Sequence, residues 1–194
     1  MNKKTLVLIL TAIVSLCLIF TFLQKEERLT SQQIENLRER YPVYGDINKL
    51  NPLIEIAVVK TTLKELAERA DTFVYGAVLE EVPVYSVYSY AKFYGYKIKV
   101  YEDTEGKFSA GEEITVIANT EFKEYNPSLA EGMKIVIPVA ESKSQQGKYN
   151  FDLCVYYVTE DGFVISAFDE KQILDKEYSG LKVEKFIQET KTPL

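Results

Sequence analysis

Carboxylates are the side chains of this sequence with the most potential for chemistry, because it contains 29 Asp and Glu residues and no His. Glu102, Asp103 and Glu105 lie together before a glycine, and Glu112 and Glu113 follow shortly after. A pair of carboxylates can act as general acid and general base, provided that the two groups face each other across a cleft. The simpler interpretation of the first three is a solvated turn.

The absence of His removes several other kinds of chemistry. Ser-His-Asp and Cys-His arrangements need an imidazole, and so do the common zinc sites. The two cysteines, Cys17 and Cys154, are too few for a Cys cluster, and the nine glycines form no phosphate-binding loop. We therefore expect no catalytic residue, no cofactor and no metal site, and a carboxylate-based envelope hydrolase is the alternative within the enzyme class.

An aromatic segment is the most unusual local composition of the chain. Tyrosine presents a flat ring with a polar tip at low entropic cost, which suits contact with a sugar, a peptide or another protein. The competing interpretation is that these rings alternate along strands and fill a core, because Tyr also favours strands. The possible binding surface consists of Tyr85, Tyr88, Tyr90, Lys92, Phe93 and Tyr94.

The elements that position these residues begin with an apolar N-terminal segment. Residues 5–23 carry no charge, and a helix of that length is roughly 28 Å long, close to the ~30 Å hydrocarbon thickness of a bilayer. Lys3 and Lys4 precede the segment, whereas the charges of residues 25–28 cancel, so the N-terminus should be cytoplasmic. We expect a cytoplasmic region at 1–4, a transmembrane anchor at 5–24 and an extracytoplasmic remainder.

Two kinds of processing would remove this anchor. A secretory signal needs small residues at its cleavage site, but residues 20–24 have the sequence FTFLQ. Lipoprotein processing needs small residues before the modified Cys, but Leu16 precedes Cys17. Both patterns match poorly, so we expect the anchor to be retained.

The exported part is long enough for one domain and is acidic. The whole chain has a formal net charge of −6, and the part beyond residue 24 is more negative still because Lys3 and Lys4 precede it. This charge opposes nucleic acid, whose binding depends on neutralising phosphates. Cys154 is the one cysteine of this part, so we expect it to be a small buried hydrophobe without a disulfide.

Three helices are expected around the strands. Thr30 to Gln33 forms a capping box, and Ile34 and Leu37 follow at helical spacing until Pro42 stops the helix. This stalk helix and a linker occupy residues 25–52; its apolar stripe could meet lipid, another copy or the domain, and docking on the domain is the default. Further helices are expected over residues 62–70 and 181–187.

From Thr72 onward the apolar residues alternate, which predicts half-buried strands. Strands are expected over residues 73–79, 96–100, 114–118, 133–139, 153–158 and 163–168, with a tight hairpin at Asp161-Gly162 between the last two. Five or six short strands must close or stack to hide their edges. We expect a mainly β domain over 53–194, an OB-like barrel with flanking helices, in which the aromatic segment follows the first strand; a small sandwich is the alternative.

Three stretches of this domain, residues 63–78, 111–116 and 131–137, carry a resemblance. They resemble a group of uncharacterised, membrane-anchored envelope proteins of Gram-positive bacteria with an OB-like or netrin-module-like barrel. The resemblance implies a scaffold and a location, and it implies no activity. Netrin-like protease inhibitors act through an N-terminal Cys held by disulfides, and this chain lacks both features.

These observations lead to one functional expectation and two alternatives. We expect a single-pass cell-membrane protein whose extracytoplasmic domain serves in binding or assembly at the cell envelope. Its partner would be a protein or a cell-wall glycan, with contact to the membrane through residues 5–24 and none to nucleic acid. The alternatives are a carboxylate-based envelope hydrolase and a structural accessory subunit of a membrane complex.

Overall fold

The computed structural model describes residues 28–45, 63–87, 91–151, 154–168 and 178–191. Over these ranges the chain is mainly β with few helices, so the expected fold class is confirmed at that level. The expected anchor at residues 5–24 lies outside the described residues, as do residues 46–52 of the expected stalk and linker. Among the residues that are described, no helix is both long and apolar enough to cross a membrane.

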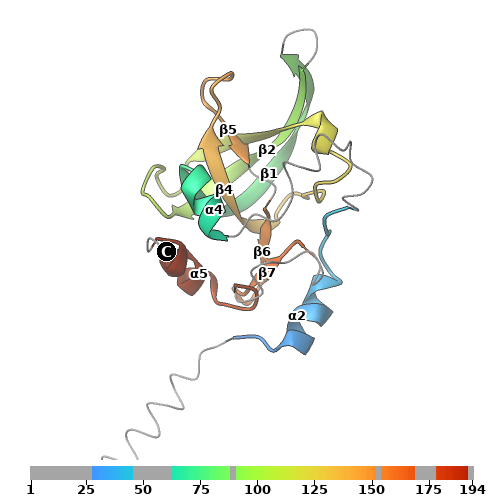
Figure 1. Cartoon of the computed structure of the whole chain (residues 1–194), viewed down its shortest axis with the longest axis vertical. Coiled ribbons are helices and arrows are strands. Elements are labelled where there is room, and N and C mark those ends of the chain that lie inside the picture. The colour runs from blue at the N-terminus through green and yellow to red at the C-terminus, as the bar shows by residue number, and fades with distance from the viewer. Residues whose placement is uncertain (1–27, 46–62, 88–90, 152–153, 169–177, 192–194) are drawn as a thin grey trace, which may run out of the picture.

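Seven strands form one sheet whose first five members are linked in a ring (Figure 1). Their order in the sheet is β1-β2-β3-β5-β4-β6-β7, and β1 also pairs with β4. The pairing of β3 with β5 is parallel, and the other pairings are antiparallel. The strands are β1 (Thr72–Val87), β2 (Ala91–Asp103), β3 (Glu113–Asn119), β4 (Lys134–Glu141), β5 (Lys148–Phe151), β6 (Tyr156–Val158) and β7 (Val164–Ser166).

The sheet is ring-like, but it is not the barrel that the strand count predicted. The ladders that β5 forms with β3 and with β4 each join three residue pairs, because β5 is only four residues long. The six expected strands are present, and β5 is an additional one. The hairpin at Asp161-Gly162 is also confirmed: it joins antiparallel β6 and β7, and Gly162 has the positive φ of 79° that such a turn requires.

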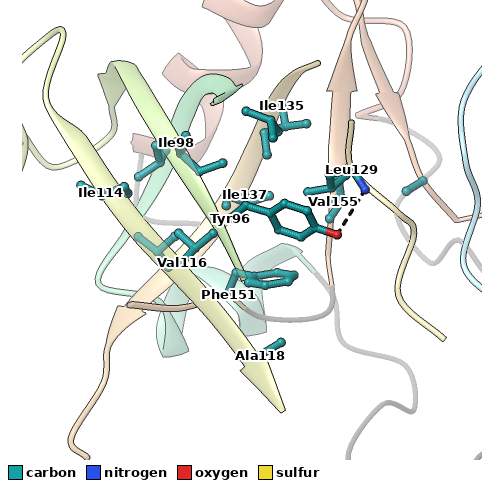
Figure 2. Packing of buried hydrophobic residues seen from close by; sticks show 14 of the residues in the cluster. Tyr96, Ile98, Ile114, Val116, Ala118, Leu129, Ile135, Ile137, Phe151 and Val155 are labelled. Atoms are coloured by element: carbon teal, nitrogen blue, oxygen red, sulfur yellow. Dashed lines mark hydrogen bonds between the residues drawn. The ribbon is translucent and has the colours of Figure 1, made fainter. Parts of the chain in front are cut away.

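Apolar side chains fill the inside of the ring (Figure 2). Tyr96 and Ile98 of β2 lie beside Ile114 of β3, and Ile135 and Ile137 of β4 face them from the other side. All five are at most 4% exposed. Their alternation along each strand turns one face of the sheet inward, so the ring has a packed interior.

A second apolar cluster lies on the outer face of the sheet and holds the C-terminal helix. Val74 of β1 belongs to the inner cluster, whereas its neighbour Phe73 belongs to this outer one. Phe186 of α5 (Val183–Lys191) is fully buried there, with its ring 4.8 Å from that of Tyr156 and 6.5 Å from that of Phe73. Leu66 of α4 (Leu63–Arg69) joins the same cluster, so both helices expected near the strands pack on the core.

The N-terminal described segment docks on the β domain. In α2 (Ser31–Arg38) Thr30 and Gln33 form the expected capping box, and Ile34 is buried. A short 3-10 helix, η2 (Thr120–Phe122), lies after β3, and the backbone N–H of Gly45 donates to the carbonyl of Tyr125 just beyond it. Of the three sites considered for this helix, docking on the domain is therefore the one found.

Aromatic stacking fixes that docking. The ring of Tyr41 lies 4.7 Å from that of Tyr157 in β6, and the hydroxyl of Tyr157 donates to the carbonyl of Pro42 at 2.9 Å. Tyr44 is 4% exposed and stacks on Phe168 at 4.1 Å. These contacts make residues 41–44 part of the packing of the domain.

Candidate functional site

The β1–β2 hairpin extends beyond the end of β4, and β3 accompanies β2 as far as Phe93, so only the distal end of the hairpin is two-stranded. Strand β4 pairs with β1 only from Thr72 to Ala77, whereas the pairing of β1 with β2 continues to Val87 and Ala91. We call residues 80–87 and 91–97 the arm. Figure 1 places the distal end of the arm at the end of the molecule opposite α2. The arm carries the aromatic segment that the sequence marked as a possible binding surface.

The structure places three of the six predicted surface residues at the surface of the arm. Tyr85 and Phe93 are half-buried, with their rings stacked 6.2 Å apart, and Lys92 is exposed. Beside Tyr85, Val84 is 49% exposed, which makes it one of the most exposed large apolar side chains among the described residues. Tyr88 and Tyr90 lie outside the described residues.

Tyr94 belongs to the core, which corrects the prediction that it forms part of the surface. It is 1% exposed, and its hydroxyl accepts a hydrogen bond from the side-chain amide of Asn126 at 2.7 Å. Tyr96 points to the same side, and its hydroxyl accepts from the N–H of Leu129. Burial raises the pKa of both tyrosines, and the hydrogen bonds offset that effect only in part. Both rings are therefore structural.

Tyr85 connects the arm to the loop between β4 and β5. Its hydroxyl donates to Oε1 of Gln145 at 2.6 Å, and Nζ of Lys148 lies 4.0 Å from the centre of the Tyr85 ring. Lys148 also donates to the same Oε1 at 3.2 Å. Gln145 is 8% exposed, and within the described residues its Nε2 has no hydrogen-bond partner. The contact fixes the ring of Tyr85 at the surface, where it can meet a partner.

A polar hollow of about 520 Å³ adjoins the same loop. The residues that line it are Asp71, Lys107, Glu141, Ser142, Lys143 and Gln146. Oδ2 of Asp71 accepts from the backbone N–H of Glu141 at 2.8 Å and from Nζ of Lys107 at 2.9 Å. These bonds lower the pKa of Asp71, and the bond to Asp71 raises the pKa of Lys107. The hollow therefore contains a fixed ion pair at neutral pH.

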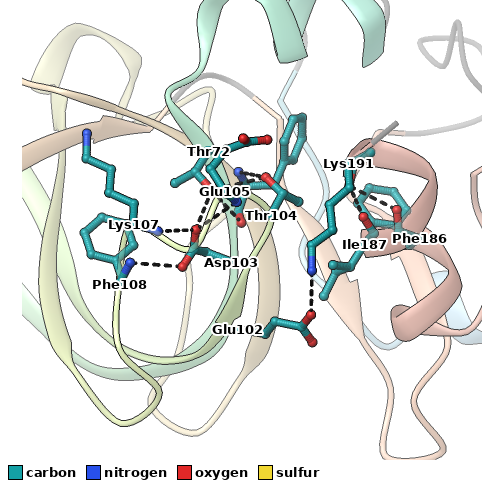
Figure 3. A network of polar contacts seen from close by, with 12 residues as sticks. Thr72, Glu102, Asp103, Thr104, Glu105, Lys107, Phe108, Phe186, Ile187 and Lys191 are labelled. Carbon is teal, nitrogen blue, oxygen red and sulfur yellow. Dashed lines mark hydrogen bonds and ion pairs between the residues drawn. The ribbon is translucent and has the colours of Figure 1, made fainter. Parts of the chain in front are cut away.

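A turn organised by Asp103 positions Lys107 (Figure 3). The carboxylate accepts from the hydroxyl of Thr72 at 2.9 Å and from the backbone N–H groups of Glu105, Lys107 and Phe108 at 2.9–3.0 Å. Asp103 is 5% exposed, so the expected solvated turn is wrong for this residue. Burial acts to raise its pKa, but the four hydrogen bonds outweigh burial and lower it. Asp103 is a structural anion.

Asp71, Asp103 and Glu102 do not form the pair of facing carboxylates that a hydrolase would need. A general acid at neutral pH requires a raised pKa, whereas the pKa values of Asp71 and Asp103 are lowered. Glu102 pairs with Lys191 at 3.0 Å on the surface. Among the described residues no three His, Cys, Asp or Glu side chains are grouped to hold a metal ion, and Cys154 is buried as expected.

Comparisons with known proteins do not assign the chain to a family. No protein-family model matches the chain, and no curated protein is significantly similar to it in sequence. The resemblance to membrane-anchored envelope proteins therefore remains a prediction from residues 63–78, 111–116 and 131–137. Function has to be argued from the arm, the β4–β5 loop and the polar hollow.

Proposed function

We propose that this chain is a single-pass membrane protein, anchored by residues 5–24, whose β domain is a binding or assembly module on the outer side of the cell membrane. The uncharged N-terminal segment, with Lys3 and Lys4 before it, supports the anchor and its orientation. The net negative charge of the chain argues against nucleic acid as the partner.

The observation that carries the binding role is the arm and the way it is held. Val84 and Lys92 are exposed, and Tyr85, which stacks on Phe93, is fixed by Gln145 and Lys148. A side chain that is already ordered loses little entropy when a partner binds, so its contact area contributes more fully to affinity. The Tyr85 ring packs against the ring of Phe93 and the ammonium of Lys148, and such an aromatic ring suits a protein surface or a glycan.

The place of the arm favours a partner away from the lipid. The anchor would join the domain through α2, and the distal end of the arm lies at the opposite end of the molecule (Figure 1). An anchored domain in this orientation would direct Val84 and Tyr85 toward the cell wall or a neighbouring protein. Our proposal therefore names a protein or a cell-wall glycan, and not the membrane surface, as the partner.

The pairing order of the ring also supports a relation to OB folds. In those folds the connections between strands 1 and 2 and between strands 4 and 5 flank the ligand-binding face. Here Tyr85, near the end of β1, and Gln145, between β4 and β5, are hydrogen-bonded at 2.6 Å. We propose an OB-related scaffold whose binding edge is formed where these two connections meet.

Photo-crosslinking in intact cells that produce the full chain tests this proposal. A photoreactive amino acid at Val84 should yield a defined crosslinked product, whereas the same group at Tyr101 should not. Tyr101 is a matched control because it is also exposed, at 38% against 49% for Val84, and lies on β2 outside the arm. A reporter enzyme active only outside the cytoplasm, fused after Leu194, should be active.

Three results would count against the proposal. Equal crosslinking from positions 84 and 101 would remove the arm as the binding edge. Products obtained only from residues 28–45 would favour a structural accessory subunit held through its anchor and stalk. An inactive reporter after Leu194 would place the domain in the cytoplasm and overturn the location.

A further inference from the structure

The polar hollow beside the β4–β5 loop presents charges of both signs. Asp71 and Glu141 contribute two carboxylates, and Lys107 and Lys143 contribute two ammonium groups. Asp71 and Lys107 pair with each other at 2.9 Å. Within the described residues, the Glu141 carboxylate and the Lys143 ammonium have no hydrogen-bond or ion-pair partner. Glu141 acts on Lys107 through its charge, without a direct bond, so one carboxylate and one ammonium of the lining can still form direct bonds with a ligand.

We propose that this hollow is a binding site for a small zwitterion, an amino acid or a short peptide that carries both an ammonium group and a carboxylate. The volume of about 520 Å³ lies within the roughly 300–1,000 Å³ range of small-molecule sites. Glu141 pairs with the ammonium of the ligand, and Lys143 pairs with its carboxylate. Charge-assisted hydrogen bonds of this kind are stronger than neutral ones and fix the orientation of the ligand.

The balance of charges makes the site selective. An anion would meet Glu141 and Asp71, and a cation would meet Lys143 and Lys107, so a ligand of one sign gains one attraction and suffers one repulsion. A zwitterion gains two attractions. Oδ1 of Asp71 adds a further acceptor, because the hydrogen bonds from Lys107 and Glu141 both go to Oδ2. The amide of Gln146, which is exposed, adds a neutral donor and acceptor.

Backbone hydrogen bonds position the two residues of the central ion pair before a ligand arrives. The backbone N–H of Asp71 donates to the carbonyl of Val139 at 2.8 Å, and the backbone N–H of Lys107 donates to the buried carboxylate of Asp103. Nζ of Lys107 also lies 5.4 Å from the centre of the Tyr149 ring. These contacts hold the central ion pair in place, so binding orders only the side chains of Glu141, Lys143 and Gln146. The site depends on neither the anchor nor the arm.

Ligand-observed NMR titrations of the purified full-length chain in mild detergent test the site. The probes are alanyl-alanine, its N-acetyl form, its C-terminal amide and the form with both caps. Alanyl-alanine should bind saturably, and each single cap should weaken binding at least fivefold. The doubly capped form should bind no better than either singly capped form.

Charge-neutralising variants assign each end of the ligand. Glu141→Gln should weaken alanyl-alanine at least fivefold and remove the penalty of the N-acetyl cap. Lys143→Gln should also weaken the binding of alanyl-alanine at least fivefold, and it should remove the penalty of the C-terminal amide cap. Lys134→Gln, which neutralises an exposed lysine on β4 that does not line the hollow, should leave binding unchanged.

Two outcomes overturn the inference. One is the absence of saturable binding of alanyl-alanine, and the other is equal binding of the capped and uncapped dipeptides. Either result would leave the proposed binding role of the arm unaffected, because crosslinking through Val84 reports on a different part of the molecule. Conversely, if alanyl-alanine binds but position 84 gives no crosslinked product, the result supports the binding site in the hollow and not the binding role of the arm.

Discussion

Replacing Asp103 should destabilise the domain more than any other single change to an acidic side chain in its described part. The carboxylate accepts four hydrogen bonds, and three of the donors are backbone N–H groups of one turn. A hydrogen bond to a charged group contributes about 1.5–3 kcal/mol, but the four contributions do not add because the freed amides regain water. We expect Asp103→Ala to cost about 3 kcal/mol, which would lower Tm by roughly 6–12 °C.

Asp103→Asn is the matched control for the shape of the side chain. Its remaining carbonyl oxygen can replace Oδ1, which accepts from Thr72, Glu105 and Lys107. Its amide nitrogen would face the N–H of Phe108, where Oδ2 now accepts at 3.0 Å. We therefore expect a smaller loss, about 1–2 kcal/mol. Urea unfolding followed by tyrosine fluorescence suits this measurement, because the chain has 14 Tyr and no Trp.

The effect of Asp103 should also depend on pH in a defined direction. Burial acts to raise its pKa, but the hydrogen bonds outweigh burial, so its pKa in the folded state is below the ordinary value of an aspartate. Such a group stabilises the fold above its unfolded pKa and loses that contribution as pH falls through the folded pKa. The stability gap between the wild type and Asp103→Asn should narrow below about pH 4. A gap that is absent at pH 7, or that does not change with pH, would refute this account.

Three further changes test other parts of the fold. Gly95→Ala should prevent folding, because its Cβ would clash with the carbonyl oxygen of Val116, and circular dichroism of the purified variant would show it. Tyr157→Phe removes the hydrogen bond to Pro42 and should cost about 1 kcal/mol in urea unfolding, with faster proteolysis of residues 28–45. Burial raises the pKa of Tyr125 to about 12. Its contribution to stability is therefore present below about pH 10 and is lost as the pH rises toward 12. Absorbance at alkaline pH should show that Tyr125 ionises at a higher pH than exposed tyrosines do.

The strands could be predicted from the sequence where apolar and polar residues alternate in step with the buried and exposed faces of the sheet. Tyr96, Ile98 and Val100 alternate with lysines, and the structure buries all three. Strand β5 (Lys148–Phe151) was missed because it has four residues and follows a polar loop. Its parallel pairing with β3 joins segments more than thirty residues apart, and no local pattern encodes such a contact.

The candidate surface was harder to predict because composition does not determine exposure. Tyr94 has the same alternation phase as Tyr96 and Ile98, so its burial could have been inferred from the sequence. The contact of Tyr85 with Gln145 could not have been inferred from the sequence, because it depends on how the arm and the β4–β5 loop meet in space. Asp103 lies three residues before a glycine, which is a turn signal, but the sequence gives no sign that its carboxylate is buried.

The free edge of the arm limits how a partner can bind. Beyond Ala77, β1 has no strand partner on its outer side within the described residues, and such an edge could accept a strand from another chain. Pro83 interrupts this edge because it has no backbone N–H to donate. The pairing with β2 also shifts register between Val78 and Glu80 and again between Val82 and Tyr85, and irregularities of this kind twist an edge away from a regular ladder. If the arm binds a partner as we propose, recognition should therefore use side chains, so the binding energy should come from the exposed apolar and aromatic groups next to Pro83 and not from the backbone.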